Sequence, residues 1–262
     1  IDIGPSSKGL ISLLKSALPK SESYLAEYHR LRMEREYAIN PFDLPLLTIQ
    51  PSPSHLSFLV NFVGLLCTPL GDETPPDAVS PLGRAAIKAA YDEFAPGNNP
   101  KIWIKGIDPE VDACVDNLGL HTDQLTWYSI ADALFDQGDF HNATRAQRYA
   151  VPLLSDIASM ARKPIISGVY KGQTSGKETI PDYFWRSCID AISAYAVLAA
   201  PTAFDIGDAK VVALDLDEVA PRGGPEADKQ SGVMYMLARH VVGSRFFRMP
   251  ADVKAIPKKY QA

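Results

Sequence analysis

The chain has 262 residues, of which 46% are hydrophobic and 22% are charged, a composition typical of a soluble globular protein with one large or two small domains. Its formal net charge of −5 gives no overall attraction to nucleic acid or to an anionic membrane, so we do not expect direct DNA binding. The longest apolar stretches, 56–70 and 191–200, contain polar residues and are too short to cross a bilayer as a helix. No membrane span is predicted.

The three cysteines, Cys67, Cys114 and Cys188, lie far apart and form no Cys-x-x-Cys pair. A structural zinc site or a disulfide framework is therefore not expected. We interpret all three as small buried hydrophobic residues, in keeping with a reducing cytoplasm.

The first third of the chain predicts a strand, a turn and helices. Ile1 to Gly4 is typical of a strand that ends in a turn, which suggests that the chain begins inside a domain, and residues 10–18 show helical spacing up to Pro19. Tyr37 to Ile39 is interpreted as a strand that leads into a turn at Asn40 to Asp43. Residues 56–67 predict a core helix capped by Ser52 to Ser54.

The middle of the chain predicts mainly helices. Ser80 and Pro81 are typical of a helix start after the loop 68–80. Residues 101–105 alternate like a short strand or an extended arm. Asp108, Thr122 and Asp139 mark three further helix starts, and Pro152 interrupts the last of these helices.

The last third predicts a return to α/β structure. Residues 165–179 are rich in glycine and polar side chains and predict a mobile loop, and a helix follows Pro181. Residues 210–216 are mostly apolar, as in a buried parallel strand, and a final helix is expected near 227–246. We predict an α/β core from residues 1–70 and 200–262, with a mainly helical subdomain at 71–199.

Two predicted strands far apart in the sequence are expected to lie in one sheet. Ile1 to Ile3 and Val211 to Leu216 are short, apolar and β-branched, and each precedes turn residues. In such a sheet Asp2 and Asp217 emerge near the carboxyl edge, where open α/β sheets bind ligands. They are the candidate nucleotide-proximal residues.

The segment Gly172 to Glu178 resembles a phosphate-binding loop only superficially. The pattern requires Gly, four residues and then Gly-Lys-Ser/Thr, but Lys171 stands five residues before Gly176, and Glu178 stands where the magnesium-binding hydroxyl belongs. No clean strand precedes the segment. We interpret it as a solvated loop.

The strand 211–216 is followed by Asp217 and Glu218, as a Walker B strand would be. In that interpretation Asp217 faces magnesium and Glu218 polarises the attacking water. Asp215 interrupts the apolar run too early for this pattern, however, and an Asp-Glu pair is often the polar exit of a strand. Arginines that could act across a subunit boundary are Arg145, Arg148, Arg222, Arg239, Arg245 and Arg248.

Several segments in order resemble one known family. These are Ile1-Asp2-Ile3-Gly4-Pro5-Ser6-Ser7, the stretch Tyr37 to Asp43 with its Asn-Pro-Phe-Asp sequence, the stretch Phe58 to Gly71, and Val211 to Val219 followed by Tyr235 to His240. Together they resemble the ATPase half of the IcmB/DotO and plasmid TraU proteins, which belong with TraC to the motors of type IV secretion and conjugation. The Asn-Pro-Phe-Asp segment is the most specific of them.

The resemblance implies a partial RecA-like P-loop NTPase sheet with a helical insertion. In this family the Walker A loop precedes a strand similar to Ile1 to Gly4, and the Walker B strand follows a helix similar to 227–246. Both motifs would then lie outside this sequence, and Asp217 and Glu218 would not be the catalytic pair.

The resemblance also implies a hexamer that binds ATP and Mg at subunit boundaries, at the cytoplasmic face of the inner membrane. Its partners would be other secretion ATPases and inner-membrane components. The chain alone is expected to be inactive and to bind no cofactor tightly. Two alternatives stay open, a non-catalytic interaction or scaffold module of a secretion complex and an unrelated α/β enzyme with a small-molecule pocket.

Overall fold

The computed structural model describes residues 1–262 except 5, 121–123, 207–208 and 247–262. The protein is an α/β molecule that is 57% helical and contains a small two-stranded parallel sheet. The coarse prediction of an α/β chain with a mainly helical middle is therefore confirmed.

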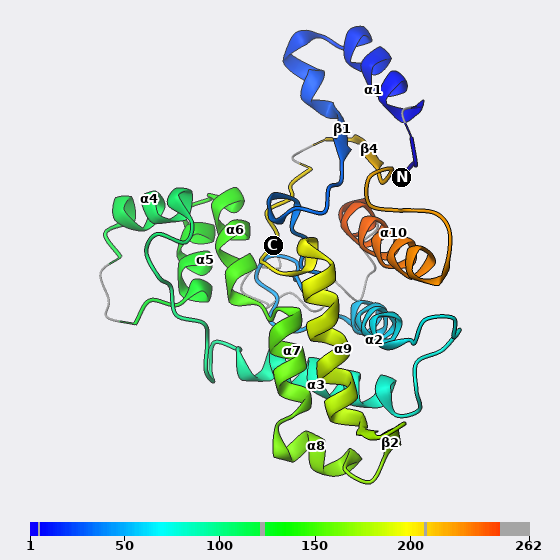
Figure 1. The fold of residues 1–262 in the computed structure, drawn as a ribbon. Helices are drawn as coiled ribbons and strands as arrows, with labels where there is room; N and C mark the ends of the chain where they lie inside the picture. Colours follow the sequence, from blue (N-terminus) through cyan, green and yellow to red (C-terminus); the bar gives the residue numbers. More distant parts are fainter. Residues whose placement is uncertain (5, 121–123, 207–208, 247–262) are drawn as a thin grey trace.

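The parallel sheet lies at one end of the molecule, below helix α1 (Ser6–Ala17) at the top of Figure 1. Strand β1 (Ala26–Arg30) pairs with strand β4 (Val211–Asp215) in a register that runs from Ala26 opposite Val211 to Arg30 opposite Asp215. Ile11 of α1 packs on Ala26 and Ala213. Leu214 points to the opposite face and joins the main core, so both faces are covered, as parallel sheets require.

The predicted strand at 210–216 is confirmed as β4, and the predicted helix at 10–18 is confirmed as part of α1, which begins four residues earlier and ends at Ala17. The prediction of a strand at Tyr37 to Ile39 was wrong, because residues Arg35–Tyr37 form a 3₁₀ turn (η2). The strand that pairs with β4 is β1 instead. Its polar residues hid it in the sequence, since Glu27, His29 and Arg30 break an apolar pattern.

The main core takes most of its buried residues from five helices, which Figure 1 shows in the lower and right parts of the molecule. They are α2 (Pro53–Cys67), α3 (Val79–Glu93), α7 (Leu154–Ala161), α9 (Ile180–Ala194) and α10 (Pro225–Phe246). The predicted cap at Ser52 is confirmed, since its side chain accepts from the His55 N–H. Helix α9 is capped by Thr179, whose side chain accepts from the Asp182 N–H; this cap was not predicted. The α3 start lies two residues earlier than Pro81, after Ala78 at φ 68°.

A second, smaller core is formed by α4 (Pro109–Leu118), α5 (Trp127–Asp136) and α6 (Phe140–Ala150). Asp108 and Asp139 cap α4 and α6 as the sequence predicted. Helix α5 is capped by Thr126, whereas the predicted start at Thr122 lies outside the described residues. The extended arm at 101–105 forms an antiparallel bridge between Ile102 and Thr126.

The prediction of a loop over 165–179 was wrong. Helix α8 (Pro164–Tyr170) and a small hairpin of β2 (Thr174–Ser175) and β3 (Glu178–Thr179) occupy this segment. Pro164 sets the backbone of the first helical position, and Gly176 at φ 59° makes the hairpin turn. Two further 3₁₀ segments, η1 (Lys20–Leu25) and η3 (Ala196–Leu198), connect larger elements.

The cores do not follow the predicted ranges 1–70, 71–199 and 200–262. Helices α2 and α3 pack together although a boundary was placed between them, and α10 packs on α2. Helices α4, α5 and α6 have a core that is separate from the main core. The division into a motor core and a helical insertion stays a prediction.

Candidate functional site at the carboxyl edge of the sheet

Three extended segments run parallel and end at one edge of the sheet. Asp2 forms a parallel bridge with Asp215 of β4, in which the Asp2 N–H donates to the Leu214 carbonyl over 2.9 Å and the Leu216 N–H donates to the Asp2 carbonyl over 3.0 Å. Strand β4 therefore lies between the Asp2 segment and β1. The predicted juxtaposition of Ile1 to Ile3 with the strand at 211–216 is confirmed at this bridge.

The fully buried Asp215 side chain organises this edge. Its Oδ1 accepts from the backbone N–H groups of Gly4 and Asp217, at 3.1 and 3.0 Å. Its Oδ2 accepts from the Tyr28 hydroxyl at 2.6 Å and from Arg30 Nε at 3.1 Å. Burial raises the pKa of Asp215, but these four donors outweigh it and leave the pKa below its usual value.

The Asp2 carboxylate accepts hydrogen bonds from residues at the start of α1. Its Oδ2 accepts from the Ser6 hydroxyl at 2.5 Å and from the Ser7 N–H at 3.2 Å, and its Oδ1 accepts from the Ile3 N–H at 2.8 Å. The hydrogen bond from Ser6 is the largest cause of the lowered pKa of this carboxyl. Asp2 therefore acts as a cap for the turn that leads into α1.

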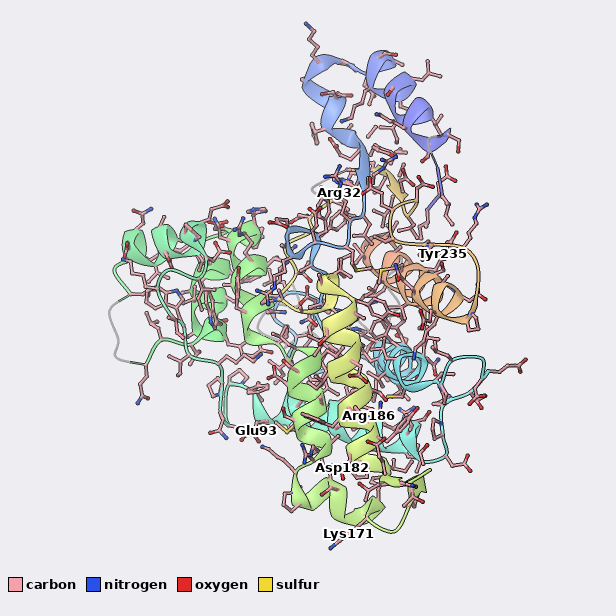
Figure 2. All side chains as sticks on the ribbon, in the orientation of Figure 1. Arg32, Glu93, Lys171, Asp182, Arg186 and Tyr235 are labelled. Carbon is pink, nitrogen blue, oxygen red and sulfur yellow. The ribbon has the colours of Figure 1, made fainter. Side chains whose placement is uncertain are left out.

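The candidate pair Asp217 and Glu218 lies in the exposed turn that follows β4. Glu218 accepts from Arg30 Nη1 at 3.0 Å and lies 3.4 Å from Arg32 Nε, so its charge is compensated within the site. The Asp217 side chain is exposed, and the backbone N–H of Asp217 donates to Asp215 Oδ1. Figure 2 shows Arg32 at the junction between the sheet and the rest of the molecule.

The side chains that meet at this edge of the sheet are mostly acidic. Three carboxylates at least partly exposed at this edge, those of Asp2, Asp217 and Glu218, would repel phosphate, and the Asp215 carboxylate lies buried beneath them. The nearest guanidinium groups, on Arg30 and Arg32, already pair with two of them. Within the described ranges there is also no group of three or more His, Cys, Asp or Glu side chains placed to hold a metal ion.

The segment Gly172 to Glu178 forms the β2–β3 hairpin and not a loop between a strand and a helix N-terminus. Glu178 accepts three hydrogen bonds from the Arg186 guanidinium, the shortest of 2.6 Å. Its carboxylate thus fixes the hairpin to α9. The geometry agrees with the interpretation that this is not a phosphate-binding loop.

Two of the six candidate arginines are engaged within the chain. Arg145 Nη2 contacts both carboxylate oxygens of Asp108 at 3.0 Å, and Arg148 Nη2 lies 3.1 Å from Asp205. The side chains of Arg222 and Arg239 are exposed. The side chains of Arg245 and Arg248 lie outside the described part of the chain.

The Asn-Pro-Phe-Asp segment forms hydrogen bonds with residues that are distant in the sequence. The buried Asn40 side chain donates to the Pro152 carbonyl at 2.9 Å and to Asp43 Oδ1 at 3.3 Å, and it accepts from the Phe42 N–H at 3.2 Å. The Asn40 N–H donates to the Thr202 hydroxyl at 2.7 Å. The segment thereby ties the start of the chain to the α6–α7 junction and to the approach to β4.

No protein-family model, no curated protein and no solved structure matches this chain. Among the helices that the structure describes, none combines the length and the apolar character needed to cross a membrane.

The hydrogen-bond network that holds this edge together was not predicted from the sequence. It is formed by Gly4, Tyr28, Arg30 and Asp215. Asp215 was treated as an interruption of a strand, although a lone carboxylate inside an apolar run is costly unless it is paired. The position of Asp215 inside an apolar run could therefore have indicated that its carboxylate has hydrogen-bond partners. The identity of its partners was not available, because Tyr28 and Arg30 lie more than 180 residues away in sequence.

Proposed function

We propose that this chain is part of the motor core of a hexameric ATPase that powers type IV secretion or conjugative transfer. The observation that supports this best is the meeting of Asp2 and Asp215 at one carboxyl edge. The two segments that carry much of the family resemblance, 1–7 and 211–219, are thus neighbours in space. Motor sheets of this kind bind nucleotide at that edge.

In this proposal the chain supplies strands, the Asp215 hub and helices, and it does not bind ATP tightly by itself. The edge is rich in carboxylates that are satisfied within the chain, and the sequence contains no Gly-x-x-x-x-Gly-Lys-Ser/Thr pattern. In the parent protein ATP and Mg would bind with the help of such a loop. The assembly would work at the cytoplasmic face of the inner membrane, with other secretion ATPases and membrane components as partners.

Calorimetric titration of the 262-residue chain with ATP and magnesium tests the first part of the proposal. We expect no binding at micromolar affinity. Micromolar binding that Lys177→Ala abolishes would contradict the proposal, because it would make the β2–β3 hairpin a nucleotide site. Micromolar binding that Lys177→Ala leaves intact would place a complete site elsewhere and would contradict it too.

The second part is tested with the product of the parent gene, by measuring its ATP hydrolysis and its mass in solution. Hydrolysis by a hexamer would support the motor assignment. A parent protein with no Gly-x-x-x-x-Gly-Lys-Ser/Thr pattern and no hydrolysis would favour the alternative of a non-catalytic interaction module. That alternative is supported by the apolar face of α8, on which Ile165 is 84% and Val169 is 72% exposed.

A further inference from the structure

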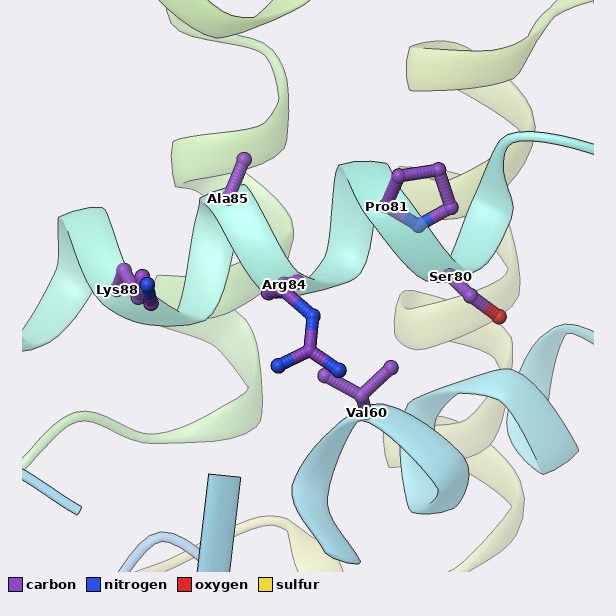
Figure 3. A pocket seen from close by; sticks show the side chains of 6 residues that line it. All are labelled: Val60, Ser80, Pro81, Arg84, Ala85 and Lys88. Carbon is purple, nitrogen blue, oxygen red and sulfur yellow. The ribbon is translucent and has the colours of Figure 1, made fainter. Parts of the chain in front are cut away.

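A hollow of about 410 Å³ lies between α2 and α3, on the main core and far from the sheet edge. Figure 3 shows its lining, with Val60 of α2 opposite the α3 residues Ser80, Pro81, Arg84, Ala85 and Lys88. The walls formed by Val60, Pro81 and Ala85 are apolar. The hollow can therefore accept an apolar side chain.

Two cations, Arg84 and Lys88, flank this hollow. Arg84 and Lys88 are exposed and one helical turn apart on α3, and no carboxylate of the described residues lies within ion-pair distance of either. Arg145 and Arg186, by contrast, each pair with two carboxylates. A ligand that fits the hollow should thus carry negative charge beside an apolar group.

The loop between α2 and α3 carries that combination. Leu70 is 52% exposed, and the turn that follows presents Asp72 and Glu73, both exposed. Gly71 at φ 87° and a hydrogen bond from the Asp72 N–H to the Pro69 carbonyl at 3.2 Å shape the turn. Asp77 adds a third exposed carboxylate, and no ion pair of the described residues involves any of the three.

The α2–α3 region is therefore acidic in the loop that leads into α3 and basic along the middle of α3. Residues 68–83 contain three carboxylates and no Lys or Arg, whereas Arg84 and Lys88 follow directly. When two copies of such a face meet around a two-fold axis, the acidic end of each lies against the basic part of the other. An isologous contact of this kind satisfies both patches at once.

We propose that this face is a self-association surface, in which the Leu70 to Glu73 turn of one copy docks into the α2–α3 hollow of a second copy. Leu70 occupies the apolar hollow, and Asp72 and Glu73 pair with Arg84 and Lys88. The contact does not involve the sheet edge, so it stands apart from the proposed nucleotide chemistry. Because the patches are small and charged, the dimer is weak and sensitive to salt.

Sedimentation velocity over a concentration series, with charge-reversed variants, tests this proposal. Arg84→Glu with Lys88→Glu makes both patches acidic, and Asp72→Lys with Glu73→Lys makes both patches basic. We expect the wild type to dimerise and each variant to lose at least about tenfold in association constant. An equimolar mixture of the two variants should recover the dimer, because both contacts in the mixed pair are again complementary.

The matched control is Lys171→Glu with Lys177→Glu, which changes the net charge equally on exposed lysines of the α8 and hairpin region and should leave dimerisation unchanged. Thermal unfolding of each variant confirms that it is folded. A wild type that stays monomeric up to about 1 mM, or a mixture that fails to recover the dimer, would overturn the proposal. Growth of the wild type beyond a dimer would overturn the two-fold arrangement.

Discussion

At the scale of single residues, the carboxyl groups of Asp215 and Asp43 have pKa values that are shifted in opposite directions. Asp215 is surrounded by donors, and its pKa lies below the usual value. At Asp43 burial is the largest cause and raises the pKa to about 6, although Thr202, Arg148 and Asn40 act in the other direction. In each case the direction of the pKa shift depends on whether burial or the hydrogen-bond donors have the larger effect.

We expect Asp215→Ala to destabilise the sheet edge by about 1–3 kcal/mol, because it leaves the N–H groups of Gly4 and Asp217 without their acceptor. The check is urea unfolding combined with amide hydrogen exchange, which should accelerate at Gly4 and along β4. Asp217→Ala removes an exposed carboxylate two residues away and is the control, with a change within about 0.5 kcal/mol. Equal effects of the two substitutions would contradict the hub role of Asp215.

The raised pKa of Asp43 predicts a dependence of stability on pH. A carboxyl whose folded pKa exceeds its unfolded pKa contributes stability below about pH 4, and this contribution is lost as the pH rises through about 6. A difference of about 2 between the two pKa values corresponds to about 3 kcal/mol.

Asp43→Asn should therefore gain about 3 kcal/mol relative to the wild type between pH 4 and pH 7, measured as urea unfolding free energies across that range. If Asp43→Asn runs parallel to the wild type, Asp43 titrates alike in the folded and unfolded chain, and the electrostatic account of this residue is wrong.

At the scale of elements, the sequence predicted those that carry strong local signals. The starts of three helices could be predicted from Ser52, Asp108 and Asp139. A capping side chain accepts from an N–H group two or three residues further along the chain, so the signal is local. Strand β1 was missed because its polar side chains are satisfied by partners distant in sequence, such as Asp215 for Tyr28. Local patterns cannot contain that information.

Two helical glycines in the main core differ in the space beside them. A Cβ on Gly64 of α2 would meet Pro75 Cγ at 3.7 Å, which is ordinary contact, whereas a Cβ on Gly83 of α3 would meet Val63 Cγ2 at 3.0 Å and Phe184 Cε2 at 3.3 Å. Val63 and Phe184 are fully buried and have little room to move. The close approach of α3 to α2 and α9 thus depends on Gly83.

Gly64→Ala should stabilise the protein by about 0.5–1 kcal/mol, through helix propensity alone. Gly83→Ala gains the same propensity but overpacks the core, and we expect a net loss of about 1 kcal/mol. Thermal unfolding of the two variants side by side is the measurement. Stabilisation by both substitutions would show that α3 can shift away from α2 at little cost.

At the scale of the whole molecule, polar contacts join the main core and the α4–α6 core. The Gln147 side chain donates to the carbonyls of Leu44 and Pro45 and accepts from the Leu47 N–H, and Lys101 donates to the Val151 carbonyl. The sequence predicted that the middle is helical. It did not predict that α3, α7 and α9 share a core with α2 and α10, because helix periodicity shows which face is buried and not against what.

The smaller α4–α6 core should unfold before the main core, because a small core buries less apolar surface per residue. The three tryptophans can report on the two cores separately: Trp103 and Trp127 belong to the α4–α6 core, and Trp185 packs against the main core. In urea, Trp185→Phe should show the earlier fluorescence transition, and the double variant Trp103→Phe with Trp127→Phe should show the later one. Coincident midpoints would mean that polar contacts such as those of Gln147 couple the two cores into a single cooperative unit.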